Sequence, residues 1–409
     1  MQMRNPKIMI VYASYGEGHY QVSKAMEASF HERGITNVVL LDLMAEAHPL
    51  INELTKFVYM QSFKTIPYLY GWVYNSTRRM QPGRPLYSLL HSFGLRKLAK
   101  IVADINPDLV IHTFPQLVMP KLLRRTGQTI PLANVITDFD IHGRWVHPSV
   151  NRYYVATQDL KNEMVARGVP EERVMVSGIP LRPGFAAAAA VQAKAGDLTG
   201  RPDSDPGSRP DPGSNQGPAY SLPQDGKPAI LLMAGAYGVM QNIADICRRL
   251  TASGERRVIA VCGKNKELLA QLQEQFKGHR DVQVCGFVQN IAELMAASDC
   301  IITKPGGITL SEALASRLPM FLFRPVPGQE LNNALYLNKK GIAFISNRPR
   351  ELVRQIEQFF SSRQPGGELY QELDSLRRPD AANEIAEDLL RLFIWPAEEA
   401  GRVTAAGPY

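Results

Sequence analysis

The chain has 409 residues, of which 45% are apolar and 21% are charged. This length predicts two domains, and the composition is that of a soluble globular protein. Residues 1–6 lack a long apolar run, and no segment reaches the roughly 18 to 20 uninterrupted apolar residues that a membrane-spanning helix needs. We therefore expect neither a secretory signal nor a transmembrane helix. The four cysteines, none in C-x-x-C spacing, are expected to be buried free thiols in the cytoplasm.

The net charge of +7 comes entirely from the first half of the chain. Residues 1–185 hold 21 Lys and Arg against 14 Asp and Glu, whereas the remainder holds 25 of each kind. Within that half, Leu54–Lys100 contains eight basic and nine aromatic residues and no acidic one. Such a segment can bind an anionic membrane surface, bind single-stranded nucleic acid, or form a basic solvated face over core aromatics. No nucleic-acid motif accompanies it, which disfavours the second interpretation.

Strand-like and helix-like patterns alternate through residues 1–185. The apolar run Lys7–Ala13 ends at a loop with two glycines, and helical spacing continues from Val22 to Phe30 until Gly34. Five more strand-like runs follow, at residues 38–43, 109–113, 132–137, 152–156 and 174–177. Strands separated by helices predict parallel βαβ units, and therefore a Rossmann-like N-terminal domain over residues 1–185.

The composition changes abruptly at Ala186. Residues 186–226 contain the tetrapeptide DPGS twice and few residues that could be buried, so we predict a disordered linker. Strand-like runs then resume at residues 229–233, 258–261, 282–284, 300–303, 320–323 and 342–345. They predict a second Rossmann-like domain over residues 227–378. A helix over residues 379–396 is expected to pack on the N-terminal domain, before a tail at 397–409. The predicted fold is α/β, with two Rossmann-like domains facing across a cleft.

The loop Ser14–His19 is the first candidate site. Its glycines, Gly16 and Gly18, allow close approach of a ligand to the backbone, and His19 opens the following helix. The helix dipole favours a neutral imidazole there, which can act as a general base. Gln21 stands where a dinucleotide-binding loop has its third glycine, so a dinucleotide site is not expected. The alternative is a tight turn with a surface histidine.

Two loops in the second half carry further candidates. The loop with Gly235 follows a strand and could hold phosphates, although any Rossmann-like unit can have a glycine there. The segment Lys304–Ala313 reads KPGGITLSEA, in which Thr309 and Glu312 either form a helix capping box or contact a nucleotide. Residues 325–333, PVPGQELNN, could contact several sugar hydroxyls or form a polar turn and cap.

Together these stretches resemble the processive diacylglycerol glucosyltransferases of Gram-positive bacteria. That family is related to plant monogalactosyldiacylglycerol synthases and to the enzyme that adds N-acetylglucosamine to make lipid II, in glycosyltransferase family 28. The matching stretches run in order from residue 8 to residue 345 and include YGEGH (15–19), HTFPQLVMP (112–120), VITDFDIHGRWVHP (135–148), SGIPLRPGF (177–185), ITKPGGITLSEA (302–313) and PVPGQE (325–330). The low-complexity insertion is longer than expected for the family.

The resemblance implies a GT-B fold and an inverting hexosyltransferase that needs no metal or other cofactor. It implies transfer of glucose from UDP-glucose to diacylglycerol and, by successive additions, onward to glucosyl-diacylglycerol. The base would be His19 or Asp138. The implied donor-binding residues are Gly16, Gly18, Gly235, Val288 for uracil, Gly306, Gly307 and Thr309 for the diphosphate, Glu312 for ribose, and Gln329 and Glu330 for the hexose. Asp138-Phe139-Asp140 matches a metal-binding D-x-D formally, but by the resemblance it lies in the acceptor domain.

The family also implies a peripheral protein at the cytoplasmic face of the membrane, with an anionic lipid surface as partner and no nucleic acid. The candidate membrane and acceptor contacts are Lys56, Phe63, Lys64, Trp72, Arg78 and Arg79. Three alternatives stay open: a UDP-galactose-dependent monogalactosyldiacylglycerol synthase, a UDP-sugar epimerase, and a non-catalytic UDP-sugar sensor.

Overall fold

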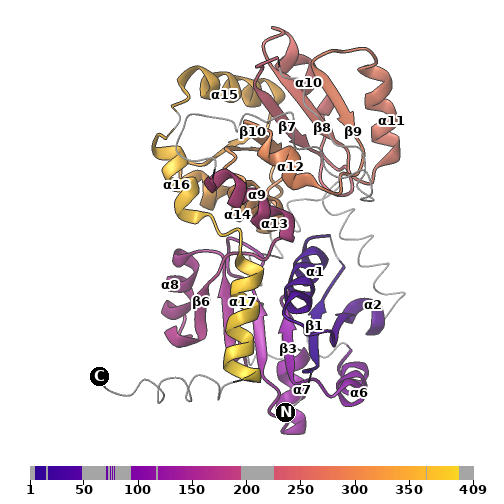
Figure 1. Cartoon of the computed structure of the whole chain (residues 1–409), viewed down its shortest axis with the longest axis vertical. Coiled ribbons are helices and arrows are strands. Elements are labelled where there is room, and N and C mark those ends of the chain that lie inside the picture. Colours follow the sequence, from indigo (N-terminus) through magenta and orange to yellow (C-terminus); the bar gives the residue numbers. More distant parts are fainter. Residues whose placement is uncertain are drawn as a thin grey trace. The chain divides into compact units, whose positions relative to one another are not determined.

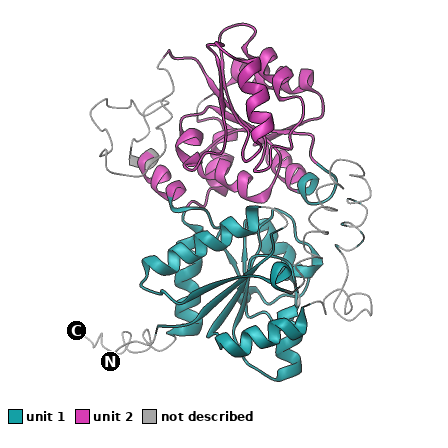
Figure 2. Cartoon of the chain, turned by 90° about the vertical axis from the view of Figure 1, so that its right-hand side faces the viewer, with its two compact units in different colours: residues 1–183, 326–332, 380–409 teal, residues 184–325, 333–379 magenta. Residues whose placement is uncertain are grey.

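The computed structural model describes residues 5–14, 17–47, 71, 74, 76, 78, 94–116, 118–194, 225–364 and 366–395. The chain folds into two compact units (Figure 2). Unit 1 comprises Met1–Pro183, Val326–Asn332 and Asp380–Tyr409, and unit 2 comprises Gly184–Pro325 and Asn333–Pro379. Each unit is therefore built from segments that are separated in the sequence.

Unit 1 contains a parallel sheet, in which Figure 1 labels β1, β3 and β6. Its strand order among the described residues is β2-β1-β3-β4-β5-β6. Its strands are β1 Ile8–Tyr12, β2 Val38–Asp42, β3 Leu109–His112, β4 Leu132–Val135, β5 Arg152–Val155 and β6 Val174–Val176. Every residue of β3 and β4 is buried. Strands of a parallel sheet covered on both faces read as continuous apolar runs, which is the pattern that predicted them.

The helices of unit 1 come from both ends of the chain. They are α1 Glu17–Glu32, α2 Leu43–Ala47, α6 Leu95–Ile105, α7 Val118–Thr126, α8 Gln158–Ala166 and α17 Ala381–Leu389, with short turns η1 Gly143–Trp145, η2 Glu171–Arg173 and η3 Leu390–Ile394. Helix α1 turns Val22, Met26 and Phe30 into the core. It packs against α17, while α6 packs against α7.

Buried polar contacts anchor α17 in unit 1. Asp388, which is 5% exposed, accepts hydrogen bonds from Arg152 Nε at 2.7 Å and Tyr154 Oη at 2.8 Å. One turn earlier, Asn383 accepts from Ser29 Oγ at 2.6 Å. The ion pair of Asp388 with Arg152 compensates a carboxylate that would otherwise be costly to bury. The C-terminal helix expected over residues 379–396 therefore lies on unit 1.

Unit 2 contains a second parallel sheet, with the order β12-β11-β10-β7-β8-β9 among the described residues. Its strands are β7 Ala229–Met233, β8 Arg257–Val261, β9 Val282–Cys285, β10 Cys300–Thr303, β11 Met320–Phe323 and β12 Ala343–Ser346. The helices that begin after Arg182 and before Pro379 are α9 Pro183–Lys194, α10 Ile243–Thr251, α11 Lys266–Gln275, α12 Ile291–Ala296, α13 Gly307–Ala315, α14 Gln329–Lys339, α15 Pro349–Ser362 and α16 Glu368–Leu376. Alternate strand residues such as Ile230 and Leu232 form one core with Ile246 of α10 and Ile356 of α15. All twelve predicted strand runs are present in the two sheets.

The strand orders create one topological switch point in each unit. In unit 1 the chain crosses from β1 to β2 on one side, and β3 to β6 follow on the other side of β1. In unit 2, β8 and β9 follow on one side of β7, and the chain then returns to place β10, β11 and β12 on the other side. Ligands of open α/β sheets bind beyond the carboxyl ends of the strands at such a reversal. The loops after β1, β3, β7 and β10 are therefore the places to look for a site.

The predicted domain boundaries are wrong in two places. The linker does not begin at Ala186, because α9 continues to Lys194 and buries Phe185 and Ala189. Alanine is the best helix former, so the alanine run extends the helix that starts at Pro183. Residues 195–224 lie outside the described part, where the linker stays a prediction. The second correction is that Val326–Asn332, assigned to the C-terminal domain, belongs to unit 1.

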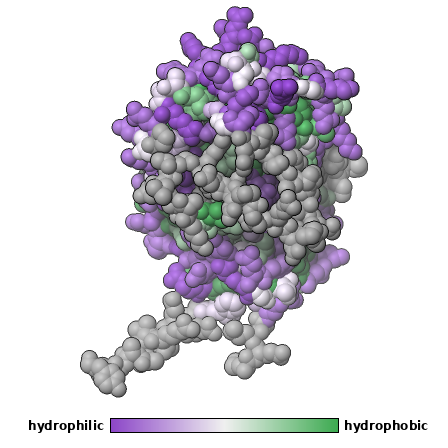
Figure 3. Space-filling view, turned by 45° about the horizontal axis from the view of Figure 1, so that its top comes forward, coloured by the Kyte–Doolittle hydropathy of each residue, from purple (hydrophilic) through white to green (hydrophobic). Residues whose placement is uncertain are grey.

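Every helix among the described residues is too short or too polar to cross a bilayer. On the face shown in Figure 3, the described side chains are mostly hydrophilic, with apolar ones scattered among them. The large apolar side chains that are exposed in the described part are Val165, Val191, Tyr237, Val239, Phe287, Leu335 and Leu392. They belong to several different elements. The four cysteines are free and buried, as expected.

Candidate active site

His19 lies in the first turn of α1, at the switch point of unit 1. Its Nδ1 is 2.6 Å from the carbonyl oxygen of Thr113, which follows β3. A carbonyl oxygen only accepts, so Nδ1 carries the hydrogen and Nε2 keeps its lone pair. Thr137 Oγ1 lies 3.3 Å from the same nitrogen, and the ring of Phe114 packs edge-on against the imidazole. The tautomer that leaves Nε2 as a proton acceptor is thereby fixed.

Burial lowers the pKa of His19 to about 4. The sequence predicted this direction from the helix dipole, but the main cause in the structure is desolvation of the charged form. The imidazole is therefore neutral near pH 7 and can accept a proton. Gly18 lies beside it in α1, whereas Gly16 lies outside the described residues. His19 is partly buried and hydrogen-bonded, so the alternative of a surface histidine on a tight turn is wrong.

The segment Thr137–Asp140, which we call the TDFD loop, follows β4. It carries two buried carboxylates. Asp138 is 6% and Asp140 is 5% exposed. The side-chain nitrogen Nε2 of Gln329 donates to Asp138 Oδ1 at 2.5 Å. Two predicted site residues that are 191 positions apart in the sequence are thus brought together.

Asp140 is held by three donors in unit 1. It accepts from Tyr74 Oη at 3.1 Å and from Asn332 Nδ2 at 2.8 Å, and it forms an ion pair with Arg78. Arg78 also lies 3.9 Å from Glu163. The described residues contain no group of three or more His, Cys, Asp or Glu that could hold a metal ion.

Of the six predicted membrane contacts, Arg78 alone is among the described residues. Its guanidinium is directed at Asp140, so an internal ion pair accounts for this one of the basic residues. The other five, Lys56, Phe63, Lys64, Trp72 and Arg79, lie outside the described part of the chain. Their membrane role stays a prediction.

In unit 2 the loop after β7 needs its glycines for backbone reasons. Gly235 and Gly238 have φ of 83° and 60°, a region that residues with a Cβ atom rarely adopt. A Cβ at Gly263, in the loop after β8, would lie 2.5 Å from the carbonyl oxygens of Gly235 and Ala236. The two loops are therefore packed backbone against backbone. Gly235 is explained by this packing without a ligand, and its phosphate role stays a prediction.

The loop after β10 leads into α13, whose N-cap is Gly306. The first hydrogen bond of this helix runs from Leu310 N to Gly306 O at 3.0 Å, so the amides of residues 307–309 precede it. Such amides and the positive end of the helix dipole attract anions. A Cβ at Gly306 would meet nothing within 4 Å, so this side of the loop is open. The arrangement suits a diphosphate.

The capping-box explanation of Glu312 is wrong. The helix begins at Gly307, so Thr309 and Glu312 lie within it, and Gly306 occupies the N-cap. Glu312 is 7% exposed. The ribose contact of Glu312 stays a prediction. Asn333 supports the loop by donating to the carbonyl of Pro305 at 3.2 Å.

The side chains of Gln329 and Glu330 both make internal hydrogen bonds, so their predicted contacts with the hexose stay a prediction. Glu330 Oε2 accepts from the amide of Val326 at 3.0 Å, so this carboxylate caps its own turn. Gln329 instead donates to Asp138, as described above. Val288, the predicted uracil neighbour, is 5% exposed, and the adjacent Phe287 is 51% exposed with Lys264 Nζ 5.7 Å from its ring centroid.

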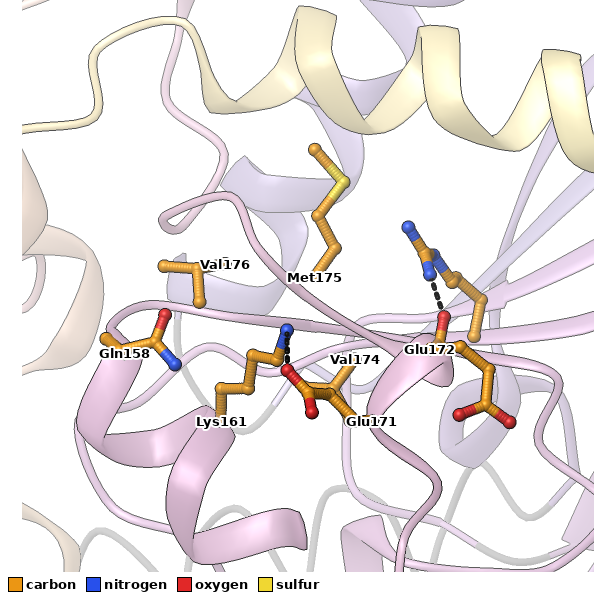
Figure 4. Close-up of a pocket in the computed structure, with 8 residues that line it drawn as sticks. Gln158, Lys161, Glu171, Glu172, Val174, Met175 and Val176 are labelled. Carbon is orange, nitrogen blue, oxygen red and sulfur yellow. Dashed lines mark hydrogen bonds and ion pairs between the residues drawn. The ribbon is translucent and has the colours of Figure 1, made fainter.

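A separate pocket in unit 1 contains none of the predicted catalytic or donor-binding residues (Figure 4). Its lining comes from β5, α8, η2 and β6 and consists of Arg152, Gln158, Lys161, Glu171, Glu172, Val174, Met175 and Val176. Lys161 and Glu171 form an ion pair across it at 3.1 Å. The loops at the switch point of unit 1 follow β1 and β3 and do not line this pocket.

Comparison of the sequence with known proteins identifies the family of this chain. The family model described as monogalactosyldiacylglycerol (MGDG) synthase matches residues 19–181, and the one described as glycosyl transferases group 1 matches residues 221–375. Processive diacylglycerol beta-glucosyltransferases of Bacillus cytotoxicus and Bacillus mycoides are 36% and 37% identical over 391 residues, covering 95% of this chain and 94% of each relative. The chain belongs to this family. The resemblance identified from the motifs is confirmed.

Solved structures agree with the fold expected of a diacylglycerol glucosyltransferase. The calicheamicin glycosyltransferase has a TM-score of 0.61 at 14% identity and covers 96% of this chain and 100% of its own. MurG of Acinetobacter baumannii has a TM-score of 0.57 at 14% identity, covering 95% and 100%. The UDP-GlcNAc 2-epimerase of Neisseria meningitidis, bound to UDP-GlcNAc, has a TM-score of 0.55 at 13% identity, covering 94% and 100%. At these identities the likeness shows the fold alone, which is GT-B as predicted.

The residues that support His19 and Asp140 were not predicted from the sequence. Thr113 and Thr137 contact the imidazole, and Tyr74 and Asn332 contact Asp140. The two threonines could have been found, because each follows a strand whose carboxyl end lies at or next to the switch point. Neither Tyr74 nor Asn332 carries such a signal.

Proposed function

We propose that this protein transfers glucose from UDP-glucose to the hydroxyl of diacylglycerol and then to glucosyl-diacylglycerol. The observation that carries this proposal is the identity of 36–37% over 95% of the chain with enzymes named processive diacylglycerol beta-glucosyltransferases. The geometry agrees with it, because each unit offers suitable groups at its switch point.

Unit 2 supplies the donor contacts in this proposal. The amides at the start of α13 hold the diphosphate beside Gly306 and Gly307, Thr309 adds a hydroxyl, and Glu312 accepts from the ribose. As the bond to UDP breaks, negative charge develops on the leaving diphosphate. Preorganised amides and a helix dipole stabilise such charge without reorganisation. We therefore propose that transfer needs no metal ion, and that activity is unchanged when a chelator such as EDTA is added.

Unit 1 supplies the base. The acceptor oxygen attacks the anomeric carbon from the side opposite UDP, so the configuration at that carbon inverts. As the new bond forms, the hydroxyl proton passes to Nε2 of His19, and the bonding electrons leave with the diphosphate. Asp138 is the second candidate, since it is an accepting carboxylate in the same unit. His19 is preferred because its hydrogen bond to Thr113 leaves Nε2 unprotonated.

We also propose that the protein works as a peripheral protein on the cytoplasmic face of an anionic membrane. The basic and aromatic segment Leu54–Lys100 would supply the contact. Each basic residue near an anionic surface contributes about 1 kcal/mol, and salt screens that attraction. Binding to anionic vesicles should therefore weaken as the salt concentration rises. Binding that is insensitive to salt would indicate apolar insertion instead.

UDP-galactose is the alternative donor, because residues 19–181 match the model described as monogalactosyldiacylglycerol synthase. Purified full-length protein, anionic vesicles containing diacylglycerol, and either UDP-glucose or UDP-galactose would decide between them. We expect lipids with one, two and more glucose units, separated by chromatography. If neither sugar reaches lipid, the proposal is wrong. Isomerised UDP-sugar would point to an epimerase, and binding without turnover would point to a sensor.

A further inference from the structure

Two amide side chains on the first turn of α14 meet the two carboxylates of the TDFD loop within unit 1. Gln329 donates to Asp138 at 2.5 Å, and Asn332 donates to Asp140 at 2.8 Å. Residues three apart on a helix share one face, so both amides are directed at the same loop. We call these four residues the amide clasp.

In the clasp the amides donate and the carboxylates accept. An ionised carboxylate only accepts hydrogen bonds, so each amide must turn its NH₂ group toward its aspartate. For Gln329 this fixes the carbonyl oxygen Oε1 on the side away from Asp138. Oε1 keeps its ability to accept a hydrogen bond, and its direction depends on how well the first turn of α14 is held.

Asp140 is the fixed end of the clasp. It is 5% exposed and also accepts from Tyr74 Oη at 3.1 Å, while Arg78 compensates its charge. The ring of Tyr74 packs against His142 at 4.9 Å between centroids. A carboxylate held by Tyr74 and Arg78 from one segment and by Asn332 from another has little freedom to move, so its hydrogen bond to Asn332 restrains the helix turn that carries Gln329.

We propose that Asn332 and Asp140 are positioning residues for sugar transfer, which hold the first turn of α14 so that Gln329 stays on Asp138 and presents its carbonyl oxygen to a hydroxyl of the hexose. This inference rests on the proposed function, because it names the residues that support its hexose contact. Asn332 and Asp140 do not themselves touch the reacting atoms. Replacing either residue should therefore weaken binding of the sugar and leave binding of the uridine diphosphate unchanged.

The test compares the affinity of the full-length protein for UDP-glucose with its affinity for UDP, by titration calorimetry. Asn332→Asp places a carboxylate against Asp140 and breaks the clasp. We expect UDP-glucose affinity to fall about tenfold or more, as when a hydrogen bond to a charged group is lost, while UDP affinity stays within about twofold. A general loss of folding would weaken both ligands together.

Two further variants make the test specific. The exchange Asp140→Asn with Asn332→Asp restores an amide facing a carboxylate, and it should recover UDP-glucose affinity to within about threefold of wild type. The control substitution is Asn338→Asp. Asn338 lies on the same helix and donates to the carbonyl of Ala343 at 2.8 Å. This control loses a hydrogen bond outside the clasp and should leave the ratio of the two affinities unchanged.

The clasp is disproved if an Asn332→Asp protein that circular dichroism shows to be folded weakens UDP and UDP-glucose equally, or if the folded exchange variant recovers nothing. If wild type transfers glucose to lipid and the variants bind UDP-glucose normally, the clasp fails and the proposed function stands. If wild type transfers no sugar but shows the expected affinity changes, the proposed function fails and the clasp stands. A wild-type protein that does not bind UDP-glucose would overturn both.

Discussion

Replacing His19 by Gln should remove the base and reduce kcat by about 10² to 10⁴, the usual contribution of a general base. The structure also predicts how the wild-type rate depends on pH. The base is the neutral imidazole, and burial lowers its pKa to about 4, so protonation removes it only in strong acid. At pH 5.5 about 97% of such a side chain is neutral, against about 9% for an imidazole with the ordinary pKa of about 6.5. The two cases differ about tenfold in rate at pH 5.5.

The assay is the initial rate of UDP release with UDP-glucose and anionic vesicles containing diacylglycerol, from pH 5.5 to pH 8. The rate should stay nearly constant over this range, with circular dichroism confirming that the protein stays folded. His31→Gln is the matched control, because His31 is an exposed residue at the other end of α1. The role of His19 as the base is refuted if the acid limb of the rate has its midpoint near pH 6.5, or if His19→Gln keeps more than about a tenth of the activity. Loss of activity in Asp138→Asn with a mild effect of His19→Gln would make Asp138 the base.

Three further predictions concern stability and ligand binding. Asp388→Ala should destabilise the fold by about 3–5 kcal/mol in urea denaturation, because it leaves the partly buried Arg152 and the buried Tyr154 hydroxyl without their acceptor. Asp374→Ala breaks a pair whose side chains are 41% and 46% exposed and should cost below about 1 kcal/mol. Similar costs for the two variants would show that burial does not set the strength of these pairs. Gly306→Ala should leave the melting temperature unchanged, since its Cβ would point into open space, and should weaken UDP binding about tenfold in calorimetry; unchanged binding would place the diphosphate elsewhere. Burial lowers the pKa of His112 in the folded protein to about 3. As the pH falls below about 6.5, the unfolded state therefore takes up a proton at this residue while the folded state does not. The free energy of unfolding should consequently fall by about 2 kcal/mol between pH 7 and pH 5 because of His112. Urea denaturation of His112→Asn at both values should show a smaller loss, and an unchanged loss would exclude His112 as the cause.

The strands and the loops that follow them were predictable from the sequence. Parallel strands buried on both faces are apolar runs, and such runs marked β1, β3, β7 and β10. The loop at Gly306 and Gly307 could be recognised because a strand, two glycines and a helical pattern follow one another directly. The family motifs identified the GT-B fold for the same reason, since each motif is a short continuous stretch.

The tertiary structure decided which residues meet. The linker boundary was misjudged because a low-complexity composition begins before α9 ends. The capping box was excluded only when α13 was seen to begin at Gly307. The neutral state of His19 depends on burial by residues after β3 and β4, and not on the helix dipole alone.

The sequence by itself determined the two sheets, the positions of their loops and the family, because local hydrophobic pattern and turn chemistry act over a few neighbouring residues. Only the tertiary structure determined the strand order, the choice of α1 as the helix against which α17 packs within unit 1, and the pairing of Asp138 with Gln329. These features join residues up to hundreds of positions apart, for example 354 between Ser29 and Asn383. Such contacts form because buried donors and acceptors must be paired once the units are compact, and no local pattern records which partner each will find.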